Sequence, residues 1–236
     1  MAPSGPVVFA YLDEPPFCWP AASSAAQGCD VELVTTVLHA LGITRFEQRL
    51  TTFAELLPGL ASGRWTLTTP LFVTSERQQL VDFSRPVWAL ADGLLVRTED
   101  RARLTGYHAV ATTGARLAVV AEQVQEQAGL TAGIAPERMI RVATQEEAVV
   151  AVRTGRADAY ASVAMAHRGY LAREPDAGLA IVNVSASESV PAAGAFAFGK
   201  QHASLRQRFD AALEGLVGSD WHRAMMARHG FPTGEY

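Results

Sequence analysis

One arginine stands where an apolar run ends, a position from which it could bind an anion. The stretch from Leu71 to Val87 reads LFVTSERQQLVDFSRPV, so a strand-like segment ends in a hydroxyl, a carboxylate and the guanidinium of Arg77. A buried run seldom ends in charge unless that charge caps an element or meets a partner. Because a guanidinium offers a rigid fork of donors that matches a carboxylate, Arg77 indicates a site for a small ligand bearing a carboxylate. The alternative is a salt bridge with Glu76 or Asp82.

Other reactive side chains show no spacing typical of a catalytic or metal centre. Cys18 and Cys29 lack the C-x-x-C spacing of a zinc site, and they are either two free thiols or a disulfide that closes the loop between them. The histidines are scattered, and the helical patterns around His39 and His167 predict that both lie at the surface. We therefore expect no metal and no cofactor.

The composition is that of a globular protein. Hydrophobic residues make up 49% and charged residues 19% of the 236 residues, which excludes a disordered or fibrous chain. A net charge of -4 gives no basic stripe, so we expect no nucleic-acid partner. No apolar run approaches the length of a membrane span. The first residues lack the pattern of a signal peptide, which fits either a cytoplasmic chain or an exported chain in which residues 1–5 replace a removed leader.

The elements that must position Arg77 alternate between strand and helix. Strand patterns at 6–12, 46–50 and 65–71 alternate with helix patterns at 30–41 and 53–60. Thr52 and Glu55 have the spacing of a capping box, and Thr74 is typical of the cap of a following helix. The alternation predicts an α/β fold with a mostly parallel sheet.

A second series of strands and helices follows a charged run at 97–103, which is interpreted as a solvated connection. Strand patterns lie at 116–120, 139–142 and 157–161, with helix patterns starting at 123 and covering 145–153. A strand at 194–198 and a helical stripe formed by Leu205, Phe209, Leu213 and Leu216 are expected to return to the first unit. The sequence therefore predicts two α/β units.

Four segments together resemble a known family. They read FxxLLPxLxSG from Phe53, LFVTSER from Leu71, VDFSxP from Val81 and GRADA from Gly155. In this order and spacing they resemble the polar-amino-acid and ectoine-type solute-binding proteins of family 3, which serve ABC transporters. The resemblance covers residues 7–231.

The resemblance implies a type II periplasmic-binding-protein fold, with two α/β lobes joined by a two-strand hinge. It places residues 1–98 and 190–236 in lobe 1, residues 99–189 in lobe 2, and the ligand in a cleft between the lobes. It also implies a monomer without enzymatic activity that works in the periplasm or anchored outside the cytoplasm. Such a protein passes a small ligand to the membrane permease of an ABC importer.

The resemblance assigns ligand-binding residues as well. Arg77 matches the arginine that holds the ligand carboxylate. Glu14, three residues before Phe17, and Phe72 resemble the ectoine and hydroxyectoine binders, which hold a cyclic amidinium carboxylate with aromatic rings, an acid and the arginine. The full expected set is Glu14, Phe17, Phe53, Thr69, Pro70, Phe72, Arg77, Gln123, Val124 and Ser162. Each ring has core packing as its alternative, and Glu14 has the alternative of a solvated loop charge.

Four positions depart from the family pattern. Val163 stands where binders of α-amino acids place the aspartate that accepts the ligand ammonium, which disfavours such ligands unless Glu14 substitutes. Glu122 and Gln123 replace a Gly-Thr or Gly-Ala pair whose backbone donors open a helix toward the ligand carboxylate. Thr66 replaces an expected aspartate.

Two other functions use the same architecture. Cyclohexadienyl dehydratases protonate a leaving hydroxyl with an acid in the cleft, and Glu14 or Glu122 would be the candidates here. A sensory domain of a receptor would use the same binding chemistry with a different output. Trp65 and Trp88 are interpreted as packing residues.

Overall fold

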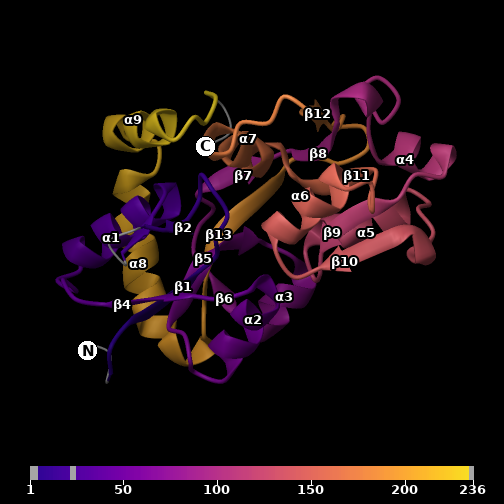
Figure 1. Cartoon of the computed structure of the whole chain (residues 1–236). Helices are drawn as coiled ribbons and strands as arrows, with labels where there is room; N and C mark the ends of the chain where they lie inside the picture. The colour runs from indigo at the N-terminus through magenta and orange to yellow at the C-terminus, as the bar shows by residue number, and fades with distance from the viewer. Residues whose placement is uncertain (1–4, 22–24, 234–236) are drawn as a thin grey trace. The chain divides into compact units, whose positions relative to one another are not determined.

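The chain passes from one unit to a second and then returns. The computed structural model describes residues 5–21 and 25–233. Unit 1 comprises the described residues up to Ala89 and those from Ala192 onward, and unit 2 comprises Leu90–Pro191 (Figure 1). The first four residues, which include most of the expected replacement leader, lie outside the described residues.

Unit 1 is built on a mixed sheet in the order β4-β1-β5-β13-β6, with β7 paired to β13. Its strands are β1 (Val8–Tyr11), β4 (Glu47–Leu50), β5 (Leu67–Phe72), β6 (Asp82–Phe83), β7 (Trp88–Leu90) and β13 (Ala192–Phe198). β1 pairs in parallel with β4 and β5, whereas β13 pairs antiparallel with β5 and β6. The prediction of a mostly parallel sheet was wrong here, because the strand that returns from unit 2 enters in the opposite direction.

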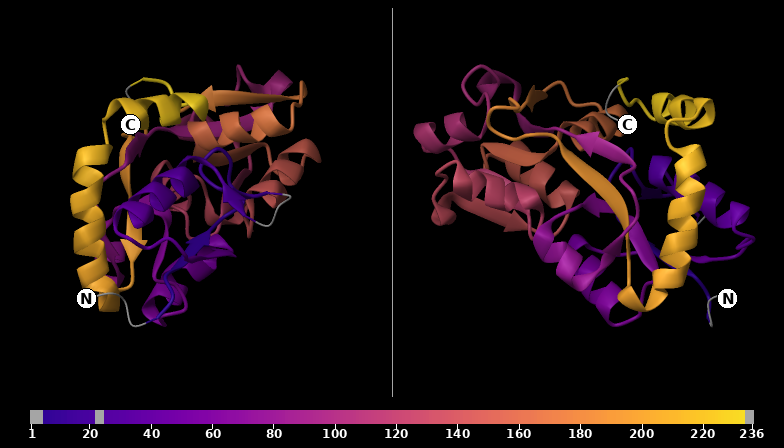
Figure 2. Two further views of the ribbon diagram at one scale, coloured as in Figure 1. Left: turned by 90° about the vertical axis from the view of Figure 1, so that its left-hand side faces the viewer. Right: turned by 180° about the vertical axis from the view of Figure 1, so that it is seen from behind.

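Helices and one small hairpin complete unit 1. They are the hairpin β2 (Trp19–Pro20) and β3 (Ala26–Gln27), the helices α1 (Cys29–Ala40), α2 (Phe53–Ala61), α3 (Ser75–Leu80), α8 (Ala203–Leu216) and α9 (Asp220–Arg228), and the short 3₁₀ helix η3 (Lys200–His202). Figure 2 shows α8 running alongside β13, where the Phe209 ring lies 5.2 Å from the rings of both Phe196 and Phe198. The C-terminal segment therefore belongs to unit 1.

The two predicted helix caps differ. Thr74 caps α3, because its Oγ1 accepts a hydrogen bond from the backbone N of Arg77 at 3.2 Å. Thr52 occupies the N-cap position of α2, but its side chain makes no capping hydrogen bond, so the capping-box prediction was wrong. The Glu55 carboxylate forms an ion pair with Arg64. That pairing explains why Glu55 does not turn back to the start of its own helix.

Unit 2 contains a five-stranded sheet in the order β10-β9-β11-β8-β12. Its strands are β8 (Asp92–Arg97), β9 (Leu117–Val120), β10 (Met139–Val142), β11 (Ala159–Val163) and β12 (Leu179–Asn183), and its helices are α4 (Tyr107–Thr113), α5 (Val124–Thr131), α6 (Gln145–Arg153), α7 (Ala164–Arg173), η1 (Thr98–Asp100) and η2 (Pro136–Arg138). β9 pairs in parallel with β10 and β11, and β8 pairs antiparallel with β11 and β12. Leu94, Val96, Leu117, Val119 and Ala161 lie in its hydrophobic core.

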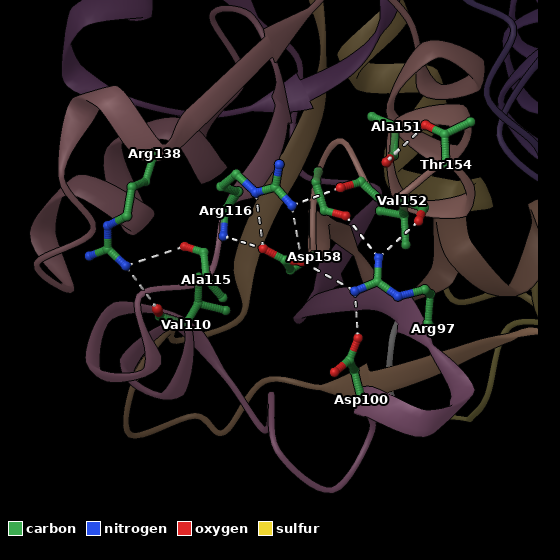
Figure 3. A network of polar contacts seen from close by, with 12 residues as sticks. Arg97, Asp100, Val110, Ala115, Arg116, Arg138, Ala151, Val152, Thr154 and Asp158 are labelled. Atoms are coloured by element: carbon green, nitrogen blue, oxygen red, sulfur yellow. Dashed lines mark hydrogen bonds and ion pairs between the residues drawn. The ribbon is translucent and has the colours of Figure 1, made fainter.

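A polar network joins the ends of three strands in unit 2 (Figure 3). Asp158, from the GRADA segment, accepts hydrogen bonds from Arg97 Nη2 at 3.2 Å and from the backbone N of Arg116 at 2.8 Å. Arg97 Nη2 also donates to Asp100 at 2.7 Å. The side chains of Arg97 and Asp100 are only 22% and 13% exposed, so the prediction of a solvated run at 97–103 was wrong for both residues. Their ion pairs hold the end of β8 beside the start of β11.

His167 is completely buried, so the prediction that it lies at the surface was wrong. Its Nε2 lies 3.1 Å from the carbonyl oxygen of Gly93, and its ring packs edge-on against Tyr160. Burial lowers the pKa of His167 to about 4. The helical period was correct, but α7 packs against β8 and β11 on the face that carries His167.

None of the helices within the described ranges combines the length and apolar character that a membrane span requires.

Candidate functional site

Arg77 is buried in unit 1 and held from two sides. It lies in the first turn of α3, immediately beyond β5, and it is 7% exposed. Its Nη1 donates to the carbonyl oxygen of Phe72 at 3.0 Å, and its guanidinium carbon lies 5.4 Å from the centre of the Phe53 ring. A carbonyl and an aromatic face therefore fix the orientation of the guanidinium, which favours geometric recognition of an anion.

An aromatic cluster extends from Phe72 to the C-terminal segment. The Phe72 and Trp88 rings are 5.4 Å apart and perpendicular, and the Trp88 and Phe17 rings are 5.8 Å apart. Phe17 also meets Phe231 edge-on at 5.7 Å. Trp88 packs as predicted, but no local pattern indicated that it links two of the expected ligand-binding rings.

Glu14 begins the turn that presents Phe17. The backbone N of Glu14 donates to the carbonyl of Cys18 at 2.8 Å, and the N of Phe17 donates to the carbonyl of Glu14 at 3.1 Å. The backbone N of Asp30 in turn donates to the carbonyl of Phe17 at 3.0 Å. The first turn of α1 thus anchors this loop through the backbone, and the Glu14 side chain remains half-buried. A continuous series of contacts therefore runs from Glu14 to Arg77 and Phe53.

A buried carboxyl lies beside this turn. Thr69 Oγ1 donates to Asp30 Oδ2 at 2.5 Å, and the sulfurs of Cys29 and Cys18 lie 3.6 Å from Asp30 Oδ1 and Thr69 Oγ1 respectively. Burial raises the pKa of Asp30 to about 7, although the hydrogen bonds from Thr69 and Cys29 act in the opposite direction. Both cysteines are buried free thiols, and burial raises their pKa values above the usual range. The structure therefore contains the dithiol form of the two alternatives.

Residues in β5, and Thr66 just before it, make contacts within unit 1. Thr66, which replaces an expected aspartate, accepts a hydrogen bond from the backbone N of Val8 at 3.0 Å. Pro70 faces Phe196 of β13, next to a shift in the strand register. The hydroxyl of Thr69 is used internally by Asp30. The Thr69 hydroxyl therefore belongs to the buried cluster around Asp30, and its contact with a ligand stays a prediction.

The expected residues of unit 2 lie at one edge of its sheet. α5 follows β9 and begins at Val124 with Gln123 as its N-cap, and Ser162 lies near the end of β11. Because β9 and β11 are adjacent parallel strands, their carboxyl ends meet at the same edge. Gln123, Val124 and Ser162 are therefore neighbours in the fold. Val163, also at this edge, is the N-cap of α7 and makes no capping side-chain bond.

Glu122 has a backbone conformation that usually belongs to glycine. Its φ is 69°, in the left-handed region, and it stands where the family pattern expects glycine. Its backbone N lies 3.4 Å from a carboxylate oxygen of Glu126, in the first turn of α5. A non-glycine residue in this conformation is strained, and such strain is concentrated at functional sites.

Residues 7–231 match the model of the family described as bacterial extracellular solute-binding proteins, family 3. The chain belongs to this family. Its fold is the type II periplasmic-binding-protein fold that the sequence predicted, because its structural neighbours are type II periplasmic binding proteins of this family. The predicted lobe boundaries near residues 98 and 190 stay a prediction. In the structure, the chain passes from one compact unit to the other after Ala89 and again after Pro191.

Three similar proteins illustrate the range of the family. A curated relative, "Probable amino-acid ABC transporter periplasmic-binding protein y4tE" of Sinorhizobium fredii, is 28% identical, and the match covers 96% of this chain and 77% of the relative. The crystal structure of EhuB in complex with hydroxyectoine is 23% identical with a TM-score of 0.87, covering 97% of this chain and 89% of that chain. The ancestral amino acid-binding protein AncCDT-1, a precursor of cyclohexadienyl dehydratase, is 20% identical with a TM-score of 0.82, covering 95% of each chain.

Proposed function

We propose that this solute-binding protein captures a small ligand that carries both a carboxylate and a cationic group, of the amino-acid or ectoine type. The observation that carries the proposal is the unbroken series of contacts in unit 1 from Glu14 through the aromatic cluster to Arg77. Its two ends have opposite charge. A zwitterionic ligand matches that arrangement.

Arg77 binds the ligand carboxylate in this proposal. Its side chain is already ordered by Phe72 and Phe53, so little rotamer entropy is lost when the ligand binds. Two parallel N–H donors engage the two carboxylate oxygens, an arrangement that lysine cannot reproduce.

Phe17 and Phe72 bind the cationic part, and Glu14 neutralises it. Aromatic faces attract diffuse cations with roughly 0.5–2 kcal/mol per contact. Trp88 holds both rings in place through a tilted contact with Phe17 and a perpendicular contact with Phe72. The half-buried carboxylate of Glu14 substitutes for the aspartate that Val163 replaces.

Unit 2 contributes the backbone donor of Val124, in the first turn of α5, and a hydroxyl from Ser162. The backbone N of Gln123, the N-cap residue, donates to the carbonyl of Val120 at 3.2 Å instead. The N-terminal end of a helix carries partial positive charge and favours an anion. The donors of Val124 and Ser162 join Arg77 on the ligand carboxylate. The expected lobe assignment, with the ligand enclosed between two lobes, belongs to this proposal.

The chain works as a monomeric binder that delivers its ligand to an ABC permease outside the cytoplasmic membrane. The family and the curated relative, named as an ABC periplasmic-binding protein, support this role. We propose that the chain is not an enzyme. Asp30, whose pKa lies near neutrality, is 2% exposed and is engaged by Thr69 and Cys29 rather than directed at a substrate.

A thermal-shift screen followed by calorimetry tests the proposal, with hydroxyectoine, L-arginine, L-glutamine, glycine betaine and succinate as probes. A ligand at 100 times its Kd stabilises the folded chain by about 2.7 kcal/mol. Arg77→Ala is expected to weaken binding of every carboxylate probe by at least about 30-fold, because one partner of a buried charge pair is lost. Arg49→Ala is the matched control, since Arg49 is an exposed arginine of unit 1 paired with Glu47.

Glu14→Gln separates the two ends of the site. It is expected to weaken hydroxyectoine and arginine while leaving the affinity for succinate unchanged. Equal losses for all probes would show that Glu14 acts through folding. Wild-type affinity in Arg77→Ala would refute the assigned carboxylate site. Turnover of prephenate or arogenate would show that the protein is an enzyme, contrary to the proposal.

A further inference from the structure

Asp92 is a buried carboxylate surrounded by three hydrogen-bond donors. It is 5% exposed and is the first residue of β8, two residues after the chain enters unit 2. Gln125 Nε2 donates to its Oδ1 at 2.7 Å, whereas Tyr107 OH and Ser189 Oγ donate to its Oδ2 at 2.9 and 2.7 Å. Hydrogen bonds to a charged acceptor are roughly twice as strong as neutral ones.

The three donors come from separate parts of unit 2. Tyr107 is the first residue of α4, Gln125 is the second residue of α5, and Ser189 lies two residues before the chain leaves the unit at Pro191. The bond between Asp92 and Ser189 therefore ties the entering connection to the leaving one. Glu188 strengthens the attachment, because its carboxylate accepts a hydrogen bond from the backbone N of His108 at 2.8 Å.

The geometry requires an acceptor at both oxygens of residue 92. Gln125 and Tyr107 are 2% and 1% exposed, so their polar groups have no ready replacement in water. An asparagine at this position keeps the size of the side chain but places an amide donor against at least one of the three donors. The charge and the acceptor geometry of Asp92 are thus specific requirements.

We propose that Asp92 is a positioning residue that couples the first turn of α5 to both connections between the units. The inference rests on the proposed function, which places the ligand carboxylate at the backbone N of Val124, in the first turn of α5. A ligand that orders this turn also orders Gln125, and through Asp92 it orders the connections at 90–92 and 185–191. Binding is thereby linked to the two segments through which the chain passes between the units.

Single-bond variants test the coupling. Asp92→Asn disturbs all three bonds, while Gln125→Met and Ser189→Ala each remove one. Tyr170→Phe is the matched control, because Tyr170 OH donates to Glu146 at 2.7 Å elsewhere in unit 2. With hydroxyectoine or L-arginine as the probe, Asp92→Asn, Gln125→Met and Ser189→Ala are each expected to raise Kd about five- to tenfold, a typical range for coupled sites. The control stays within about twofold.

Hydrogen exchange in the ligand-free protein gives a readout that needs no ligand. Asp92→Asn is expected to raise exchange both in the first turn of α5 and in residues 185–191, whereas Ser189→Ala raises it only in the latter. Adding Ser189→Ala or Gln125→Met to Asp92→Asn is expected to cause no further change, as required for one shared interaction.

The two proposals fail in different ways. If Asp92→Asn leaves exchange unchanged in either segment, or if the effects of the variants are additive, the coupling is refuted whatever the ligand. If Arg77→Ala also keeps wild-type affinity, the proposed ligand site fails as well. If no probe binds the wild-type chain, the ligand class is wrong, and the exchange pattern alone decides the role of Asp92.

Discussion

Replacing Asp30 with asparagine is expected to stabilise unit 1 at neutral and alkaline pH. The pKa of Asp30 rises from an ordinary value of 3.8 to about 7 on folding, mainly because the carboxyl is buried. Below pH 3.8 both states hold the proton, so the group has no effect. Between 3.8 and about 7 the folded state retains a proton that the unfolded state has lost, and the free energy of unfolding falls as pH rises.

The interval between those two values corresponds to about 4 kcal/mol when Asp30 is fully ionised. Asparagine is neutral at every pH and still offers an oxygen to the Thr69 hydroxyl, which donates to Asp30 Oδ2 at 2.5 Å. The stability difference between Asp30→Asn and wild type should therefore be near zero at pH 4 and grow toward about 4 kcal/mol at pH 8.

Urea denaturation at pH 4, 6 and 8 measures this difference. Tryptophan fluorescence is the appropriate signal, because all four tryptophans belong to unit 1, at positions 19, 65, 88 and 221. Far-UV circular dichroism follows both units and shows whether they unfold together. A stability difference that stays constant with pH, or that turns against the variant as pH rises, would contradict a buried carboxyl that titrates near neutrality.

Three other substitutions probe separate features. Asp158→Asn should destabilise unit 2 by about 2–3 kcal/mol at pH 7. Burial opposes ionisation of Asp158, but hydrogen bonds from Arg116 and Arg97 lower its pKa, so the stability it contributes is lost as pH falls through that lowered value. Denaturation followed by circular dichroism at pH 7 and 3 measures this loss. Gly194→Ala should cost about 1–3 kcal/mol and shift tryptophan emission, because an added Cβ would lie 2.0 Å from the Trp88 ring; unchanged emission would contradict that contact. Glu122→Gly should relieve backbone strain and tighten carboxylate binding several-fold in calorimetry, whereas weaker binding would show that the Glu122 side chain is needed.

Local sequence signals predicted the structural features that depend on neighbours in the chain. Thr74 and Arg77 are three residues apart, and the cap that joins them follows from residue type and spacing. The start of α5 beside Gln123 was likewise placed by its pattern. Such features need no knowledge of which distant segments meet.

Long-range pairings were beyond the reach of those signals. Asp30 and Thr69 are 39 positions apart, and an acid in the first turn of a helix has an ordinary local explanation, so its burial was not foreseen. Arg97 and Asp158 are 61 positions apart, and a charged run was therefore interpreted as solvated. The direction of β13 also depends on where the chain re-enters unit 1. Periodicity shows that an element has a buried face but does not identify what covers it.

The position of β13 sets the order in which the two units can be completed during synthesis. Unit 2 is one uninterrupted segment, and its last strand ends at Asn183. Unit 1 lacks the strand between β5 and β6 until Phe198 has been made, although β1 and β5 emerge far earlier. The nascent chain therefore carries β5 with an unpaired edge while unit 2 acquires its full sheet. Synthesis of unit 1 begins first, but its sheet is completed only after that of unit 2.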